Sequence, residues 1–150
     1  MRIVGGKYRG RKITGPNNQN IRPTSDRARE ALFNILNHKK FGGLPDGKAV
    51  LDVFAGTGAL GFEALSRGAR EVFFIEQSKP ISKIIKTTAC ALQEIDNIKL
   101  LTEDATQLGK AVHSFDLILM DAPYKSGQSE PSLNVLAEGG WLRKIRRAHV

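Results

Sequence analysis

From residue 49 onward, hydrophobic residues form short, almost uninterrupted runs separated by glycine-rich turns and amphipathic segments. The runs at 49–54, 72–75, 98–101 and 115–120 predict four strands. A predicted helix over 60–67 follows the first strand, and another opens at Ser78 and Pro80 after the second. Apolar strands that alternate with helices are typical of a parallel sheet covered on both faces. The pattern therefore predicts an α/β fold.

Residues 1–47 follow a different pattern. Ile3, Val4 and Ile13 flank a basic stretch interrupted by glycines, which favours a hairpin or turn-rich arm within residues 1–22. Thr24 or Ser25 can cap a helix that follows this arm. The apolar stripe predicted for that helix consists of Ala28, Ala31, Leu32, Ile35 and Leu36. The glycine-rich stretch 42–47 resembles a linker, so we expect an N-terminal extension over 1–47 and a body over 48–150.

Charge is distributed unevenly between these parts. Residues 1–50 carry 11 basic and 3 acidic groups, a net +8, whereas residues 51–140 carry 8 basic and 12 acidic groups, a net −4. A basic leader on an acidic body favours contact with a polyanion over the alternative of a solvated surface. A single cysteine excludes an internal disulfide, and no apolar run reaches the roughly 20 residues that span a bilayer. We therefore expect a cytoplasmic protein without a membrane segment.

Acidic residues stand in or just after the carboxyl end of each predicted strand. They are Asp52, Glu76, Asp104 and Asp121. A buried strand normally avoids carboxylates because an unpaired buried charge is costly. Ligands of open α/β sheets bind beyond the carboxyl ends of the strands. Four carboxylates at equivalent positions therefore indicate a ligand-facing rim.

The turn after the first strand contains Gly56, Gly58 and Gly61 in the spacing G-x-G-x-x-G, which by itself suggests a nicotinamide dinucleotide. Asp52 opposes that interpretation, because a carboxylate near the turn is unsuited to a pyrophosphate. It suits the cationic amino-acid end of S-adenosylmethionine. Glu76 is then expected to accept hydrogen bonds from the ribose hydroxyls, and Asp104 to meet the adenine amino group.

The fourth strand is followed by Asp121-Ala122-Pro123-Tyr124. The exocyclic amine of a nucleobase is a poor nucleophile, because its lone pair is delocalised into the ring. The carboxylate of Asp121 and a backbone carbonyl can accept its two N–H groups, while Tyr124 stacks on the base and holds it in line. The segment therefore predicts a target-base site. The three histidines (His38, His113 and His149) lack the spacing of metal ligands, so no metal site is expected.

Three motifs in order resemble the bacterial 16S rRNA guanine-N2 methyltransferases of the RsmD type. They are the opening run from Arg2 to Arg11, the leader run from Arg22 to Leu36 and the glycine-rich run from Leu51 to Ala69. The resemblance implies a Rossmann-like class I methyltransferase sheet with a basic hairpin and helix extension. It also implies methylation of guanine-966 at N2, in 16S rRNA or the assembling small subunit, with S-adenosylmethionine and without a metal.

The motifs and clusters described above, together with this resemblance, give the expected site residues. Cofactor binding is expected at Asp52, Phe54, Gly56, Thr57, Gly58, Glu76 and Asp104. The catalytic target-base site is expected at Asp121, Pro123 and Tyr124, with Ala122 standing where the family has another proline. Phosphate contact is expected from Lys7, Arg9, Arg11, Lys12, Arg22 and Arg27.

The resemblance also implies a seven-stranded sheet in the order 3-2-1-4-5-7-6, whereas only four strands are visible before the basic residues 143–150. We therefore expect a sheet that is truncated after its fourth strand, with self-association through that exposed edge. Two main alternatives stay open at this point: a non-catalytic RNA-binding fragment and a nicotinamide-dependent oxidoreductase. A protein-glutamine methyltransferase is a weaker third, disfavoured by Asp121 and the basic leader.

Overall fold

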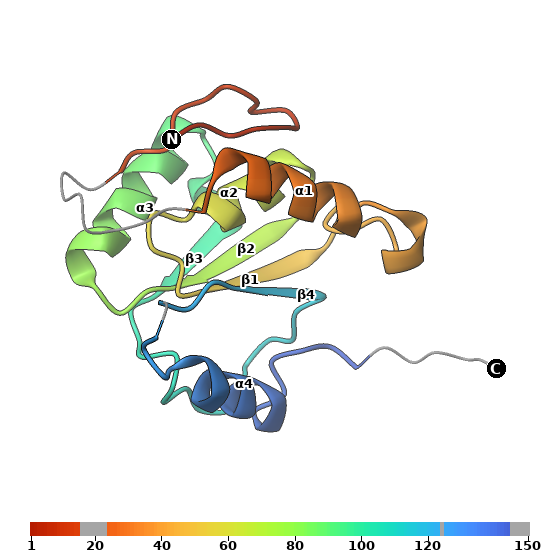
Figure 1. The fold of residues 1–150 in the computed structure, drawn as a ribbon. Helices are drawn as coiled ribbons and strands as arrows, with labels where there is room; N and C mark the ends of the chain where they lie inside the picture. Colours follow the sequence, from red (N-terminus) through yellow and green to blue (C-terminus); the bar gives the residue numbers. More distant parts are fainter. Residues whose placement is uncertain (16–23, 124, 145–150) are drawn as a thin grey trace.

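Four parallel strands form one sheet in the computed structural model, which describes residues 1–15, 24–123 and 125–144 (Figure 1). The strands are β1 (Ala49–Val53), β2 (Glu71–Ile75), β3 (Ile98–Leu101) and β4 (Leu117–Met120). Their order is β3-β2-β1-β4, with parallel pairing throughout. The α/β class and the four predicted strands are confirmed. The order matches the first four positions of the class I methyltransferase sheet.

Helices cover both faces of this sheet. They are α1 (Asp26–Leu36), α2 (Ala59–Ser66), α3 (Lys79–Ala91) and α4 (Ser129–Glu138), with short 3₁₀ helices η1 (Lys39–Phe41) and η2 (Ile95–Asn97). Figure 1 shows α1, α2 and α3 on one face and α4 on the other. The hydrophobic pattern did not predict α4, because only Ser132 and Leu136 of it are buried. None of the helices in the described residues is long and apolar enough to cross a membrane.

Alternate residues of the strands point into two separate hydrophobic cores. Val50, Val72 and Phe74 pack under α2 and α3, whereas Leu51 and Phe73 pack on the side of α4. This alternation follows from the two-residue period of a strand. Both cores are needed to bury β1 and β2, which explains why these strands are apolar on both faces.

Aromatic residues close the core beneath α4. Trp141 stacks on Phe115 at a ring-centroid distance of 6.3 Å, and its indole N–H donates to the carbonyl of Gly109 at 3.0 Å. The next residue, Leu142, forms a parallel bridge with Phe115. The chain therefore comes alongside the beginning of β4, but from Leu117 onward β4 has no neighbour on that side among the described residues.

The N-terminal arm is a hairpin, as predicted. Arg2 and Lys12 form an antiparallel bridge, and the Ile3 amide donates to the Arg11 carbonyl at 2.9 Å. Ile3 and Ile13 are buried in the same core as the residues of α2 and α3. The apolar side chains of the arm are thus docked on the body, while its basic side chains lie at the surface.

The predicted apolar stripe of α1 is wrong in part. Ser25 is the N-cap, but Ala28, Ala31 and Ile35 of the predicted stripe are exposed. The buried residues of α1 are instead Arg29 and Phe33. A hydrophobic pattern cannot identify this face, because its central residue is a charged side chain that is buried through an ion pair.

That ion pair belongs to a buried network around Glu63 of α2. The Glu63 carboxylate accepts hydrogen bonds from the backbone N–H groups of Val4 at 2.9 Å and Gly5 at 3.0 Å. It also pairs with Arg29 at 3.3 Å and with Arg67 at 2.9 Å. One buried carboxylate therefore ties the hairpin and α1 to the body.

Candidate functional site

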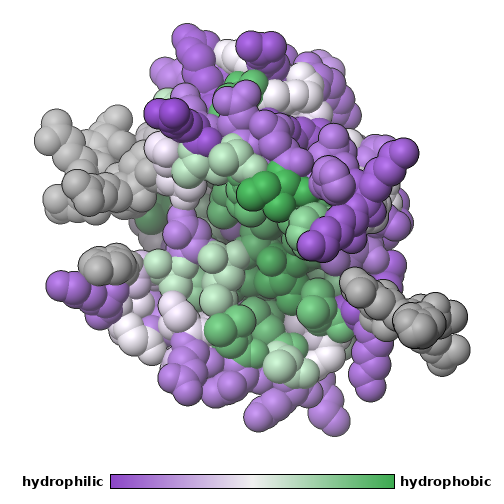
Figure 2. Space-filling view, turned by 45° about the vertical axis from the view of Figure 1, so that its right-hand side comes forward, coloured by the Kyte–Doolittle hydropathy of each residue, from purple (hydrophilic) through white to green (hydrophobic). Residues whose placement is uncertain are grey.

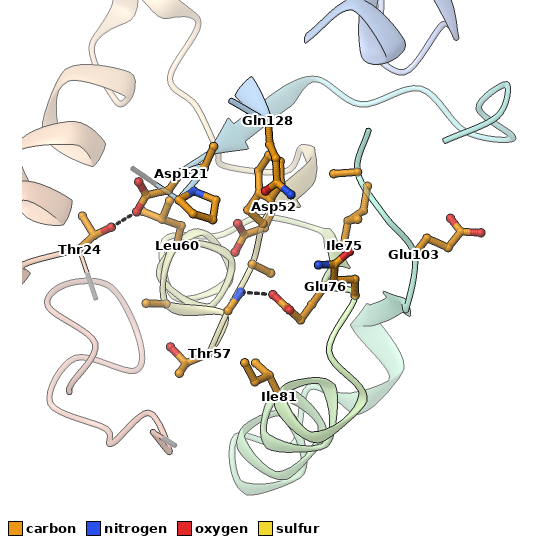
Figure 3. Close-up of a pocket in the computed structure, with 18 residues that line it drawn as sticks. Thr24, Asp52, Thr57, Leu60, Ile75, Glu76, Ile81, Glu103, Asp121 and Gln128 are labelled. Atoms are coloured by element: carbon orange, nitrogen blue, oxygen red, sulfur yellow. Dashed lines mark hydrogen bonds between the residues drawn. The ribbon is translucent and has the colours of Figure 1, made fainter. Parts of the chain in front are cut away.

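A cavity of about 700 Å³ opens beyond the carboxyl ends of the strands (Figure 3). Its volume lies in the range of pockets that hold cofactors and other small molecules. The lining residues come from the ends of β1 and β2, the segments that follow the four strands, the first turns of α2 and α3, and the residue before the N-cap of α1. Of the predicted cofactor and target-base residues, those that line it are Asp52, Phe54, Gly56, Thr57, Glu76, Asp121 and Pro123. The fold thus brings most of the predicted site together.

Two glycines of the G-x-G-x-x-G turn, Gly56 and Gly61, serve different purposes. Gly56 has a positive φ of 57°, and a side chain there would meet no other atom, so its backbone faces open space. At Gly61, by contrast, an added Cβ would lie 2.2 Å from the Phe74 ring. Gly61 is therefore required for packing α2 against β2, and Gly56 is the glycine over which a ligand can lie. Phe54 also has a positive φ, of 59°, a strained conformation for a bulky residue.

Asp52 is a buried carboxylate at the end of β1. One of its oxygens accepts a hydrogen bond from the backbone N–H of Gly61 at 2.9 Å. Burial raises the pKa of Asp52 well above its ordinary value near 3.8, and the negative charges of Asp121 and Glu76 raise it further. The Gly61 hydrogen bond opposes this shift without cancelling it. A cationic ligand group would therefore be strongly favoured beside Asp52.

Glu76, at the end of β2, connects two turns of the site. Its carboxylate accepts hydrogen bonds from the backbone N–H of Gly56 at 2.9 Å and of Ser78 at 3.1 Å (Figure 3). Sequence reasoning predicted only a ligand role for this residue. An ionised carboxylate has about four acceptor sites, so two hydroxyl groups can still be accepted alongside these bonds.

Asp121 follows β4 on the opposite side of the cavity. The hydroxyl of Thr24 donates a hydrogen bond to Asp121 Oδ2, although the two residues are 97 positions apart in the chain (Figure 3). Pro123 and Gln128 line the cavity nearby. Tyr124, the predicted stacking residue, lies outside the described residues.

Two predicted cofactor residues are not part of this lining. Gly58 packs against the rings of Phe62 and Phe74. The Asp104 carboxylate accepts hydrogen bonds from the N–H and hydroxyl of Thr106, at 2.8 and 2.7 Å. These bonds lower the pKa of Asp104. Its neighbours Glu103 and Ala105 line the cavity instead, because the chain has already turned beyond the end of β3.

The predicted phosphate-binding residues differ in their surroundings. Lys7 pairs with Glu94 at 3.1 Å, which raises the pKa of Lys7, and Arg11 donates to the carbonyl of Ala91 at 2.7 Å. Both residues thus help to dock the hairpin on α3 and the segment after it. Arg9, Lys12 and Arg27 are exposed. Arg22 lies outside the described residues.

Several lining residues were not found by sequence reasoning. They are Thr24, Ala55, Ala59, Leu60, Ile75, Gln77, Ile81, Glu103, Ala105 and Gln128. Thr24 precedes the N-cap of α1 and Gln128 is the N-cap of α4, and a position beside a helix start does not by itself indicate a ligand cavity. Only the tertiary structure brings them there.

The charge of the lining is one-sided. Asp52, Glu76, Glu103 and Asp121 contribute carboxylates, whereas none of the described lining residues is a lysine or arginine. Over the described ranges there is also no group of three or more His, Cys, Asp or Glu side chains placed to hold a metal ion. The arrangement suits an organic ligand that carries positive charge and hydroxyl groups.

Comparison with known proteins gives matches over almost the whole chain. The family model described as Conserved hypothetical protein 95 matches residues 1–148. Ribosomal RNA small subunit methyltransferase D of Haemophilus influenzae is 35% identical over 149 residues, covering 95% of this chain and 74% of the relative. The protein of that name from Escherichia coli K12 is 38% identical over 144 residues, covering 95% and 69%.

Solved structures share the fold. The structure of yhhF from Escherichia coli has a TM-score of 0.79 and 33% identity, and the match covers 95% of this chain and 75% of that one. A SAM-dependent methyltransferase from Thiobacillus denitrificans, in complex with S-adenosyl-L-homocysteine, has a TM-score of 0.65 at 20% identity, over 81% and 46%. The second likeness, at this lower identity, shows a shared fold alone.

Proposed function

The chain belongs to the family of ribosomal RNA small subunit methyltransferase D, and from this premise we propose that it methylates small-subunit rRNA with S-adenosylmethionine. The proposed target is the exocyclic N2 amine of guanine-966 in 16S rRNA. The names of the relatives support the rRNA substrate. The guanine N2 target is what the resemblance implies, and the Asp121-Ala122-Pro123-Tyr124 segment supports an exocyclic amine as the acceptor.

The observation that carries this proposal is the charge of the cavity. Four carboxylates and no cationic side chain, among the residues described, surround the space where a ligand would lie. A pyrophosphate would be repelled there, which disfavours a nicotinamide dinucleotide. S-adenosylmethionine carries an ammonium group and a sulfonium, and both are attracted by these carboxylates.

The cofactor fits the residues at the ends of β1 and β2. We assign its ammonium group to Asp52, whose burial and raised pKa favour a cationic partner. Glu76 accepts the ribose hydroxyls with its remaining lone pairs, while Gly56 lets the backbone approach the ligand. Phe54 and Thr57 line the same end, and contributions from Gly58 and Asp104 stay predictions. When bound, the cofactor supplies an electrophilic methyl group.

The target amine is assigned to the opposite side of the cavity. Asp121 accepts one N–H group, a backbone carbonyl of the Asp121–Pro123 segment accepts the other, and Tyr124 stacks on the base. With these acceptors in place, the lone pair of the amine would face the electrophilic methyl group that a bound cofactor would supply. The proton that the nitrogen loses passes to Asp121 or to solvent. Most of the rate enhancement then comes from positioning.

We assign RNA binding to the extension of residues 1–47 and methyl transfer to residues 48–150. The exposed cations Arg9, Lys12 and Arg27 contact phosphates directly, whereas Lys7 and Arg11 also hold the hairpin in place. The substrate is 16S rRNA or the assembling small subunit, in the cytoplasm. We further propose that the chain self-associates through the edge of β4, which has no neighbouring strand beyond Phe115 among the residues described.

The test combines methyl transfer with cofactor binding. Labelled S-adenosylmethionine is incubated with the chain and small-subunit RNA that lacks the modification, and the methylated nucleoside is identified. Asp121→Ala should abolish most transfer while calorimetric affinity for S-adenosylhomocysteine stays near that of the parent. Glu76→Ala should weaken cofactor binding about 30–150-fold, the equivalent of losing two hydrogen bonds to a carboxylate.

Three results would contradict the proposal. Binding of NAD with equal affinity would support the oxidoreductase alternative. RNA binding without any methyl transfer would support a non-catalytic RNA-binding fragment. Transfer to a different atom or nucleotide would refute the guanine N2 assignment.

A further inference from the structure

Thr24 connects the N-terminal extension to the target-base side of the cavity. It stands directly before Ser25, the N-cap of α1, and it lines the cavity together with Asp121. Its hydroxyl donates to Asp121 Oδ2. Figure 3 shows the two side chains pointing toward each other at the edge of the pocket.

The backbone on which Thr24 sits is anchored on its C-terminal side. The Ser25 side chain caps the first turn of α1 by accepting a hydrogen bond from the backbone N–H of Ala28 at 3.1 Å. A chain of ion pairs attaches the same turn to the body without involving this cap. Asp26 pairs with the buried Arg29, which in turn pairs with Glu63. The hydroxyl of Thr24 is therefore held at a defined place relative to the sheet.

Among the described residues, the Asp121 side chain accepts a hydrogen bond from Thr24 alone. It is exposed and follows the last residue of β4, which is an edge strand over Leu117–Met120 in the described sheet. An exposed aspartate exchanges between rotamers, and each exchange moves its oxygens away from the base. A donor that holds one carboxylate oxygen selects one rotamer and leaves the other oxygen to accept the amine.

We propose that Thr24 is a positioning residue for methyl transfer, which holds Asp121 Oδ2 so that Oδ1 faces the target amine. The inference rests on the proposed function of Asp121. Through Thr24, the residue that precedes the N-cap of α1, the N-terminal extension contributes to the transfer step as well as to the proposed RNA binding. A site held within about 0.5 Å of its productive geometry needs such supporting contacts.

The test uses three variants of the full chain. Thr24→Val keeps the shape of the side chain and removes the donor, whereas Thr24→Ser keeps the donor. Ser25→Ala is the matched control, because it weakens the cap of the same helix without touching Asp121. With small-subunit RNA as substrate, we expect Thr24→Val to lower kcat about tenfold, equivalent to ~1.4 kcal/mol in the barrier, with an unchanged KM for S-adenosylmethionine.

Thr24→Ser should restore transfer to within about twofold of the parent, a difference well below one tenfold step in rate. In an Asp121→Ala background, Thr24→Val should cause no additional loss, because the two residues act through one contact. Equal or faster transfer by Thr24→Val would overturn the inference. So would an equal loss in Ser25→Ala, since helix loosening would then account for the effect.

An NMR measurement tests the contact between Thr24 and Asp121 independently of methyl transfer. In a chain labelled with ¹³C at aspartate carboxyl carbons, Thr24→Val should shift the NMR signal of Asp121, Thr24→Ser should restore it, and Ser25→Ala should leave it in place. An Asp121 signal that ignores Thr24→Val would refute the contact and with it the inference. If the parent chain methylates no RNA, the proposed function fails, while this signal still reports on Thr24.

Discussion

Replacing Asp52 by asparagine should separate stability from cofactor affinity. The amide is nearly isosteric with the carboxylate, and its oxygen can keep the hydrogen bond from the backbone N–H of Gly61. The substitution removes a buried charge whose burial is unfavourable, which is why the pKa of Asp52 is raised. We therefore expect the free energy of unfolding to stay constant or to increase.

Cofactor affinity should change in the opposite direction. The buried carboxylate of Asp52 is expected to bind the ammonium group of the cofactor, whereas an amide N–H₂ in its place would point donors at a cation. A hydrogen bond between charged groups contributes about 1.5–3 kcal/mol, and its loss weakens binding roughly 10–150-fold. Calorimetry with S-adenosylhomocysteine and chemical denaturation of the same samples measure the two effects. Glu103→Gln is the control, because Glu103 lines the cavity but is exposed, and it should change affinity by less than about 1 kcal/mol.

Stability and cofactor affinity should depend on pH in opposite directions. Because the folded-state pKa of Asp52 lies above the unfolded value near 3.8, the folded chain binds this proton more tightly. The stability contributed by this group is therefore present at low pH and is lost as pH rises through the raised pKa. Affinity for a cationic ligand should instead rise over the same range, and Asp52→Asn should flatten both profiles. Unchanged affinity in Asp52→Asn, or parallel pH profiles in parent and variant, would refute the assignment of the ammonium group.

Three further predictions follow from the fold. Reversing the charge of Arg9 and Lys12 should weaken RNA binding and lower the slope of log affinity against log salt by about one per phosphate contact. An unchanged slope would mean that these cations are only solvent-exposed surface charges without a phosphate contact. Glu63→Gln should reduce the free energy of unfolding by about 3–5 kcal/mol in denaturant titrations, because it removes the buried partner of Arg29 and leaves only the exposed carboxylate of Asp26 to pair with it. Glu30→Gln, on the exposed side of α1, should have little effect. Sedimentation should show self-association through β4, because Leu117, Ile118 and Met120 are only half-buried and Figure 2 shows apolar surface near them. Leu117→Lys should raise the monomer fraction, and a parent chain that is already monomeric would exclude this interface.

Local sequence features were sufficient to predict the body of the fold. Strands such as Val72–Ile75 are apolar on both faces, and only a sheet covered by helices on both sides can bury them. The carboxyl ends of parallel strands meet at one edge, so the order of the segments alone assigns Asp52, Glu76 and Asp121 to one site. These predictions rest on periodicity and topology, which are properties of short segments and their order.

Packing between distant segments decided the rest. The buried face of α1 contains Arg29 because Glu63 lies opposite it, and neither residue reveals this in its own segment. Asp104 lies in a turn with Thr106 and away from the cavity lining, since the chain changes direction after β3. Thr24 reaches Asp121 only because the hairpin and α1 dock on the same side of the sheet. The sequence determined which residues can carry charge and donate hydrogen bonds, whereas the tertiary structure determined which of them meet.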